Sequence, residues 1–211
     1  MTRSSTVDVA DLTARARIRD AALRLYAQHG TLKTSVRMVA DEAGVSPGAV
    51  THHFRTKEQL ATAVQHFVLD KLRAAITGVG LTSAPRRAAE ERRKAFDHFL
   101  ATNPDIEGYV RHVSLEGGQA GAALFAESLD LLRHQMAQQI DAGIARELPD
   151  PEVGLVLYHA ITVAHVYFRP LIENALGLDL SDPRTRTRFR AATVDLLSHP
   201  LLIDRHRQTV R

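Results

Sequence analysis

The chain has 211 residues, of which 45% are hydrophobic and 24% are charged, and it contains no cysteine. This length and composition are ordinary for a folded protein with a sizeable core, and the lack of cysteine excludes disulfides and thiolate metal sites. The formal net charge is +3, with nine Lys or Arg against five Asp or Glu in residues 1–57 and 18 against 19 in the rest. The positive excess therefore lies near the N-terminus.

No apolar run has the length and character of a membrane span, and the N-terminus lacks a signal-peptide core. We therefore expect a cytoplasmic protein that does not enter a membrane. Residues 1–12 lack helical periodicity and are expected to form a flexible arm, in which Arg3 is either disordered or a DNA contact.

A first helix is predicted from Thr13 to His29, and Gly30 after it is a C-terminal glycine signal. Its apolar side is formed by Ile18, Ala21, Ala22, Leu25 and Tyr26. The arginines on its other side are either solvated surface or phosphate contacts, and they are Arg15, Arg17 and Arg19.

Two short helices joined by a glycine-centred turn are predicted next. Thr34 or Ser35 caps the first of them, and Gly44 suits the left-handed backbone of the turn. Ser46 caps the second, with Pro47 at its first position, where a missing N–H costs nothing. This is the pattern of a helix-turn-helix, whose second helix lies in the DNA major groove. The alternative is an ordinary helical hairpin that does not touch DNA.

The rest of the chain also has helical periodicity, and no strand pattern of convincing length appears. Thr56 and Gln59 form a capping box that opens a fourth helix to about Ile76, and breaks follow at residues 78–85. Later helices begin where a capping residue precedes proline, as at Asn103, Asp150 and Asp182. They are expected at about 85–102, 104–116, 121–147, 151–175 and 183–198.

Four runs of residues keep a spacing that spans three helices and the start of a fourth. They are Ile18-x-x-Ala21-Ala22-x-x-Leu25-Tyr26-x-x-x-Gly30, Thr34-Ser35-Val36-Arg37-x-Val39-Ala40, Ala43-Gly44-Val45-Ser46-x-Gly48 and His52-His53-Phe54-x-x-Lys57-Glu58-x-Leu60. Over residues 13–72 this pattern strongly resembles the TetR family of bacterial transcriptional regulators. The resemblance implies an all-α fold with two domains. An N-terminal DNA-binding domain of three helices occupies residues 1–57, a connecting helix residues 57–76, and a larger helical domain for effector binding and dimerisation residues 77–211.

The DNA contacts follow from helix geometry and from the resemblance. The residues expected near base edges are Pro47, Gly48, Ala49 and Arg37, whereas Thr51 and His52 are expected to bond either a base or a phosphate. By the resemblance, Thr34, Ser46, His53 and Lys57 fall on positions that grip the phosphate backbone, and the helix N-terminus at Ser35 also suits a phosphate. The alternative for the two histidines is that one of them packs at the helix end.

Two positions depart from the family pattern and remove backbone contacts. Pro47 stands where the family often has Lys or Arg, and Thr51 stands where it usually has Tyr. The affinity for DNA is therefore expected to depend more on Arg37, Arg55 and the N-terminal arginines.

The C-terminal region carries no catalytic, phosphate-loop or metal-binding motif, so we expect no enzymatic activity, no cofactor and no metal site. Six polar residues in apolar helices are candidates to orient a small effector, namely Arg111, His112, His134, His159, His165 and Arg169. The alternative is that the histidines are ordinary core residues. Charges such as Glu107, Arg111 and Glu116 would then be surface or dimer-rim groups.

The segment Val153–Phe168 contains no charged residue and is apolar on nearly every side, so it must be covered all round. The last helix is similar after a basic start. In the TetR family the last two long helices pair with their copies, and the resemblance therefore implies a homodimer. The alternative is a core helix inside a monomer. Pro170 is expected to bend or end the first of these two helices.

The predicted function is that of a repressor that a small-molecule effector releases from a pseudo-palindromic operator in double-stranded DNA. One alternative is a helical small-molecule-binding protein or enzyme whose N-terminal hairpin is merely structural. Another keeps DNA binding but has no ligand control.

Overall fold

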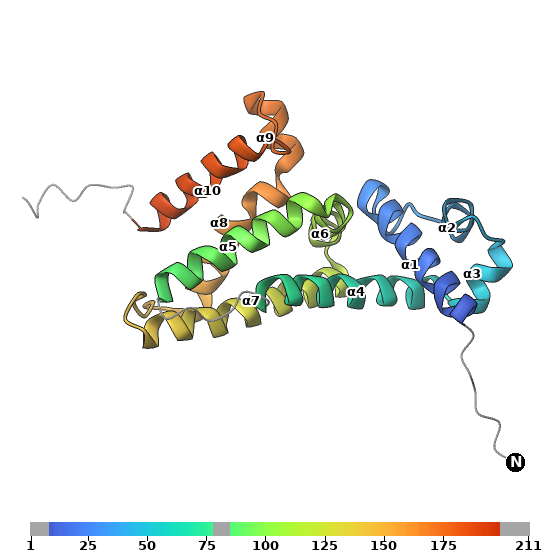
Figure 1. The fold of residues 1–211 in the computed structure, drawn as a ribbon, viewed down its shortest axis with the longest axis horizontal. Helices are drawn as coiled ribbons and strands as arrows, with labels where there is room; N and C mark the ends of the chain where they lie inside the picture. Colours follow the sequence, from blue (N-terminus) through green and yellow to red (C-terminus); the bar gives the residue numbers. More distant parts are fainter. Residues whose placement is uncertain (1–8, 78–84, 199–211) are drawn as a thin grey trace, which may run out of the picture. The chain divides into compact units, whose positions relative to one another are not determined.

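The computed structural model describes residues 9–77 and 85–198, and these ranges contain ten helices and no strand (Figure 1). The all-α fold class is confirmed. The helices are α1 (Val9–His29), α2 (Val36–Ala43), α3 (Pro47–His53), α4 (Lys57–Thr77), α5 (Pro85–Thr102), α6 (Pro104–Glu116), α7 (Gly118–Asp141), α8 (Pro151–Tyr167), α9 (Arg169–Leu176) and α10 (Pro183–Ser198). Arg3 and residues 78–84 of the predicted break lie outside the described ranges, and Pro85 is the first residue of α5.

The chain divides into two compact units, residues 1–146 and 147–211. Helices α1 to α7 belong to the first unit and α8 to α10 to the second, and each unit is described by itself. The predicted connecting helix α4 lies wholly inside the first unit, where it packs on α1, α5 and α7. The division into functional domains at residues 57–77 therefore stays a prediction.

Helices α1 to α3 enclose a small core built on the apolar side of α1. The core residues, each at most 8% exposed, are Ile18, Ala21, Ala22, Leu25 and Tyr26 of α1, Val39 and Ala40 of α2, Val50 of α3, and Phe54. Burial of this apolar surface is the main force that holds the three helices together. The turn between α2 and α3 is thereby fixed on a rigid base.

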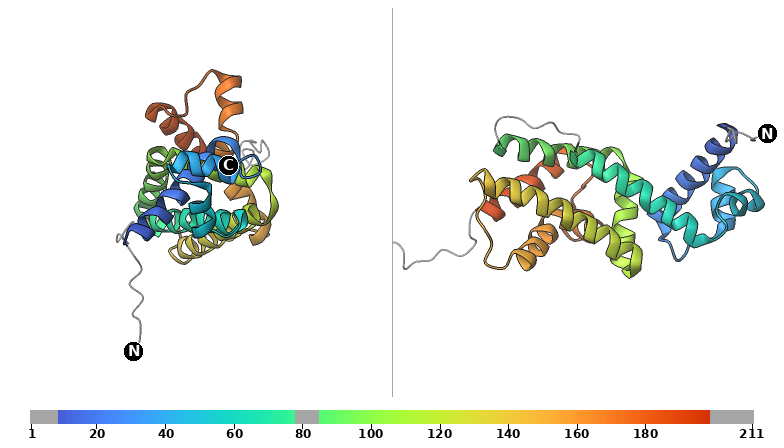
Figure 2. Two further views of the ribbon diagram at one scale, coloured as in Figure 1. Left: turned by 90° about the vertical axis from the view of Figure 1, so that its right-hand side faces the viewer. Right: turned by 90° about the horizontal axis from the view of Figure 1, so that it is seen from below.

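Helix α4 extends this core along its own length. Its buried residues recur every four positions, at Leu60, Val64, Val68 and Leu72, so one continuous stripe faces its neighbours. Figure 2 shows α4 and α7 lying alongside each other. An ion pair between Arg73 of α4 and Glu127 of α7 joins the two helices at the far end from α3.

Helix α6 lies between α1 and α7 and approaches both closely. A Cβ atom on Gly108 would lie 2.9 Å from the carbonyl oxygen of Ala27 in α1. A Cβ atom on Gly121 of α7 would lie 2.5 Å from the carbonyl oxygen of Val113 in α6. Both distances are too short for a real side chain, so each crossing depends on its glycine.

In the second unit, the predicted helix 151–175 is broken at Phe168, and α8 and α9 meet at 65°. Pro170 stands at the start of α9, as expected from its missing N–H. The Glu173 carboxylate accepts hydrogen bonds from the Arg169 guanidinium and from the Leu180 N–H, which ties α9 to the loop before α10.

No single described helix is long and apolar enough to cross a membrane, although α8 and α9 together reach the length and composition required. The predicted caps at Asp150 and Asp182 are confirmed, because their carboxylates accept the N–H groups of Val153 and Thr185. Asn103 is the N-cap residue of α6 with Pro104 at the first helical position, as predicted, but its side chain makes no capping bond. Its side-chain amide donates instead to the carbonyl of Phe99 in the preceding helix.

Candidate nucleic-acid interface

The turn between α2 and α3 is built by local interactions that the sequence predicts. Ser35 caps α2 by accepting the Met38 N–H at 3.2 Å, and Gly44 has φ +65°. Ser46 then caps α3 by accepting the Ala49 N–H at 3.1 Å, with Pro47 at the first helical position. Each of these bonds satisfies a backbone donor that a helix start leaves open. The caps and the Gly44 turn therefore fix the orientation of the N-terminal end of α3.

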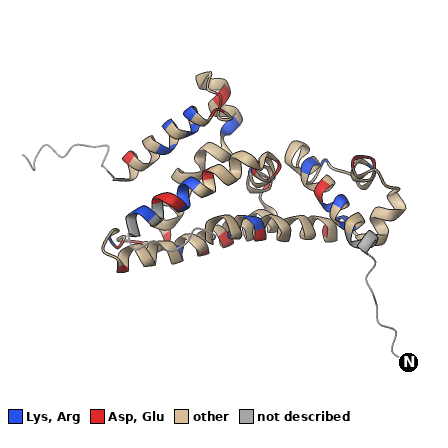
Figure 3. Cartoon of the chain, in the orientation of Figure 1, with Lys and Arg blue, Asp and Glu red and all other residues tan. Residues whose placement is uncertain are grey.

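The face of α3 presented to solvent is small and uncharged. Pro47, Gly48, Thr51 and His52 are exposed and Ala49 is half-buried, whereas Val50 points into the core. Figure 3 shows that α3 carries no Lys, Arg, Asp or Glu. The Thr51 hydroxyl bonds back to the Gly48 carbonyl at 3.0 Å. This surface allows close approach of backbone and small side chains to another molecule.

The histidines at the end of α3 lie edge to face, with ring centroids 5.3 Å apart. His52 is exposed and His53 is half-buried. The structure thus brings both rings to one end of the helix, and His52 is the more accessible of the two.

The residues predicted to grip phosphate differ in their surroundings. Thr34 is only 2% exposed and its hydroxyl donates to the Gly30 carbonyl at 2.9 Å, so this side chain lies away from solvent. Ser35, not Thr34, is the cap of α2. The exposed Arg37 follows it in α2, and the Lys57 ammonium donates to the Leu32 carbonyl at 3.3 Å.

Several cations of the first three helices bind partners within the same chain. The Arg19 guanidinium lies 3.8 Å from the centre of the Phe67 ring, and it bonds Asp20 at 2.7 Å. Arg24 bonds Glu42 of α2 at 2.7 Å. The guanidinium groups of Arg19 and Arg24 are therefore held by carboxylates and an aromatic ring, so they do not form a simple solvated basic surface on α1.

Three other guanidinium groups are exposed and have no polar partner within the described residues. They are Arg17, Arg37 and Arg55. Cations of this kind, together with capped helix N-termini, are what a phosphate backbone binds.

The sequence did not predict a polar contact between α1 and α6. The Thr31 hydroxyl, just after α1, donates to the Glu116 carboxylate at 2.6 Å, and His112 lies beside the same carboxylate next to Gly30. Burial, reinforced by the Arg111 charge, lowers the pKa of His112. These residues are about 80 positions apart in sequence, so no local pattern could have indicated the contact.

Most of the predicted effector-binding residues have structural partners of their own. In the first unit, Arg111 and His112 are neighbours on α6, and His134 is exposed on α7 with its ring at 2.8 Å from the Asp130 carbonyl. In the second unit, Arg169 belongs to the bonds that hold α9, and His165 is half-buried on α8. Glu107, expected at the surface, is only 7% exposed.

Buried titratable groups occur in both units. His159 is 3% exposed and packs edge to face against the Tyr167 ring. Burial lowers the pKa of His159 to about 4, so the imidazole is neutral at pH 7. In the first unit, burial raises the pKa of Tyr26 to about 12. Within the described residues, no three acidic or histidine side chains gather as a metal site would require.

Comparisons with known proteins agree on one family. The sequence profile described as "Bacterial regulatory proteins, tetR family" matches residues 18–64. The HTH-type transcriptional regulatory protein RaaS of Mycobacterium tuberculosis is 32% identical over 149 residues, which are 67% of this chain and 64% of that protein. The match thus spans slightly less than two thirds of the RaaS chain.

Two further proteins are similar over much of their length. The HTH-type transcriptional repressor Rv1474c of Mycobacterium tuberculosis is 34% identical over 130 residues, which are 59% of this chain and 67% of the repressor. FadR of Bacillus subtilis, solved in complex with stearoyl-CoA, superposes with a TM-score of 0.67 at 17% identity, over 89% of this chain and 99% of FadR. At that identity, the likeness to FadR concerns the fold alone.

Proposed function

The chain belongs to the TetR family of bacterial regulatory proteins, and from this premise we propose that it is a DNA-binding transcriptional regulator. More specifically, it is a repressor that a small-molecule effector releases from a pseudo-palindromic operator. The observation that carries the proposal is the exposed, uncharged face of α3, which the Gly44 turn and the Ser46 cap hold on a buried core. A short helix presented in this way fits the DNA major groove.

The bases are read by close approach. Pro47 and Gly48 leave room for the α3 backbone to approach the base edges, and the Ala49 methyl group can meet a thymine methyl group. The exposed His52 is the largest polar side chain on this face and supplies a hydrogen bond to a base or phosphate. Because the side chains are small, sequence discrimination depends on how accurately α3 is placed.

The phosphates are held mainly by groups around α3. The N–H groups at the starts of α2 and α3 that Ser35 and Ser46 do not cap are donors for phosphate oxygens in our proposal. Arg17, Arg37, Arg55 and Lys57 provide the charge in our proposal. The hydroxyl of Thr34 is left out of this set, because it is buried and bonded to Gly30.

The protein acts as a homodimer in this proposal, since successive major grooves of a palindrome need two copies of α3 about 34–36 Å apart. Exposed apolar residues in the second unit support a subunit contact there. They are Val153, Val156 and Leu157 on α8 and Val194, Leu196 and Leu197 on α10. A second copy of the same surface would remove these side chains from water.

An effector controls the dimer by favouring a geometry in which the two α3 helices no longer match the grooves. Such coupling is reciprocal, so operator DNA must weaken effector binding by the same factor. The proposed candidates to orient the effector remain Arg111, His112, His134, His159, His165 and Arg169. A protein of this function works in the cytoplasm, where its DNA is located.

A mobility-shift assay against the DNA upstream of its own gene tests the proposal directly. We expect a discrete complex at a pseudo-palindromic site. If no genomic fragment is bound even at low salt, the protein is not a DNA-binding regulator.

The Lys57→Ala variant tests the phosphate contacts. Lys57 is the first residue of α4, and loss of one phosphate contact should reduce the slope of log affinity against log salt by about 0.9. Lys71→Ala is the matched control, because it removes the same charge from the same helix 14 residues further along. Equal slopes for the two variants would show that Lys57 does not contact phosphate.

A further inference from the structure

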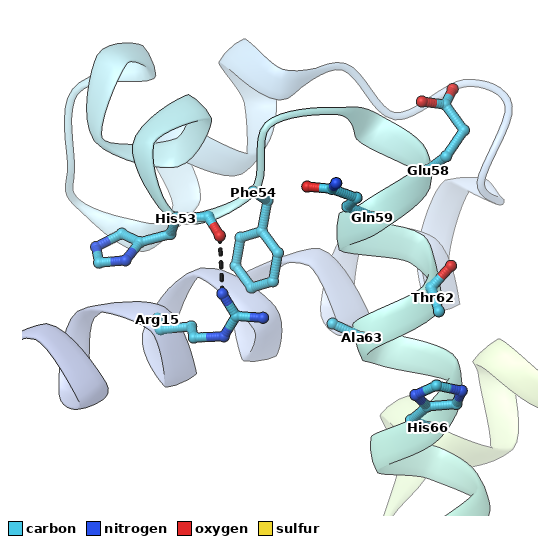
Figure 4. A pocket seen from close by; sticks show the side chains of 8 residues that line it. All are labelled: Arg15, His53, Phe54, Glu58, Gln59, Thr62, Ala63 and His66. Atoms are coloured by element: carbon cyan, nitrogen blue, oxygen red, sulfur yellow. Dashed lines mark hydrogen bonds between the residues drawn. The ribbon is translucent and has the colours of Figure 1, made fainter. Parts of the chain in front are cut away.

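Arg15 in α1 contacts the C-terminal end of α3 in two ways (Figure 4). Its Nη1 atom donates a hydrogen bond to the His53 carbonyl oxygen at 2.8 Å. The same guanidinium lies over the Phe54 ring, with its central carbon 4.3 Å from the ring centroid. Arg15 thus bonds the last residue of α3 and stacks on the first residue beyond it.

This end of α3 has a particular need for such a partner. The helix has only seven residues, and the carbonyl groups of its last turn have no partner further along the same helix. They also form the negative end of the helix dipole, where a cation is stabilising. A guanidinium bonded to the His53 carbonyl satisfies both requirements.

Phe54 anchors the same end in the core. It is 3% exposed, has extended backbone and donates its N–H to the Val50 carbonyl at 2.8 Å. The start of α3 is fixed by the Gly44 turn and the Ser46 cap. With Arg15 and Phe54 at the other end, both ends of the recognition helix are held by contacts outside the helix itself.

From this geometry we infer that Arg15 is a positioning residue, which sets the angle of α3 on α1 and thereby the sequence specificity of DNA binding. The inference rests on the proposed function. Since α3 reads bases with small side chains, a small tilt of the helix moves Gly48 and Ala49 away from the base edges. Arg15 acts on DNA through His53 and Phe54 and does not itself bind phosphate.

Arg17 provides the matched comparison. It lies two residues further along α1, is exposed, and has no polar partner within the described residues. Removal of Arg17 changes the charge of α1 as much as removal of Arg15 does. It leaves the contacts at the end of α3 intact.

The experiment measures the affinity of the full-length protein for its operator and for a scrambled duplex over a range of salt concentrations. The variants are Arg15→Lys, Arg15→Ala and Arg17→Ala. Lysine keeps the charge but lacks the planar guanidinium group, which can donate a hydrogen bond to the His53 carbonyl and stack on the Phe54 ring at the same time. We expect both Arg15 variants to lose about tenfold in operator affinity, the cost of roughly one base contact, with the scrambled duplex bound almost as before. Their salt slopes should equal that of the wild type.

A phosphate contact would behave differently. Arg15→Lys would then bind the operator like the wild type, and Arg15→Ala would lower the salt slope by about 0.9 and weaken both duplexes equally. That result overturns the inference, as does unchanged operator affinity in both Arg15 variants.

A measurement without DNA separates the inference from the proposed function. In nuclear magnetic resonance spectra of the free protein, the amide signals of His53 and Phe54 should shift in Arg15→Lys and stay in place in Arg17→Ala. Absence of these shifts overturns the contact itself. If the shifts are present but the wild type binds no DNA, the proposed function fails and the role in specificity fails with it.

Discussion

Replacing Gly108 with alanine is expected to force α1 and α6 apart where they cross. The new Cβ atom would lie 2.9 Å from the carbonyl oxygen of Ala27 and 3.0 Å from its Cβ atom. Unbonded carbon atoms rest about 3.5–4.0 Å apart, so the helices must separate by about 0.5–1 Å. The obstructing oxygen belongs to the backbone of α1 and cannot rotate aside.

Two effects of opposite sign set the magnitude. Overpacking of this kind costs about 1–3 kcal/mol, and alanine in place of glycine within a helix contributes about 1 kcal/mol of stability. Because the clash is with backbone, we expect a net loss of about 1–2 kcal/mol. This corresponds to an unfolding temperature lower by about 2–8 °C for a protein of this size. The nearby rings of Tyr26 and Tyr109, 6.5 Å apart, would lose packing as well.

Thermal unfolding followed by circular dichroism measures this loss. Gly48→Ala is the control, since Gly48 is also helical and a Cβ atom there would meet only the Ser46 hydroxyl at 3.8 Å. The control should unfold at the wild-type temperature or above it, and it should weaken operator binding by crowding the base edges. If Gly108→Ala is as stable as Gly48→Ala, the two helices do not approach as closely as described.

Three further outcomes are expected. Leu157→Glu places a charge on a side chain that is 58% exposed in the single chain, so light scattering should show monomers if α8 is a subunit contact and unchanged dimers if it is not. Burial lowers the pKa of His159 to about 4 from 6.5. The unfolded chain therefore binds more protons between these values, and the stability that His159 contributes above pH 6.5 is lost as the pH falls. Urea unfolding gives the free energy of unfolding at pH 7 and at pH 5. The difference between the two values should be about 2 kcal/mol smaller in His159→Leu than in the wild type, and an equal difference would contradict a buried neutral imidazole. The N–H and hydroxyl of Thr185 lower the pKa of Asp182, so its cap is present above the ordinary carboxyl pKa and lost as the pH falls through the lowered value. Amide exchange at Thr185 should become fast in Asp182→Ala at neutral pH, because alanine cannot accept the N–H, and persistent protection would show that the carboxylate is not the cap.

The parts of the site that follow from short-range chemistry were predicted from the sequence. The Ser46 cap, the left-handed Gly44 and the helix end at Gly30 involve residues within five positions of one another. The capping box at Thr56 is confirmed for one of its two bonds, the one from the Gln59 N–H. The return bond goes from the Arg55 N–H to the Gln59 side chain, one residue earlier than expected.

The parts that depend on distant residues were not predicted. Whether an arginine on α1 faces water, an aromatic ring or a carbonyl depends on what the fold brings beside it. Arg15 meets a partner 38 positions away, and Thr31 meets one 85 positions away. Periodicity identifies the exposed side of a helix, but it does not identify the side chains that cross that side from another element.

The uncharged face of α3 links these observations to specificity. With Pro47 and Thr51 in place of cationic or phenolic side chains, α3 provides little affinity of its own, and the Thr51 hydroxyl is turned back onto the helix. In the proposed function, binding strength then comes from charges around α3, which act on any DNA sequence. Discrimination comes from a short helix whose contacts need close approach. A regulator built in this way gains more from holding α3 rigidly at both ends than from adding charge to it, and the contacts at Gly44, Ser46, Arg15 and Phe54 provide that rigidity.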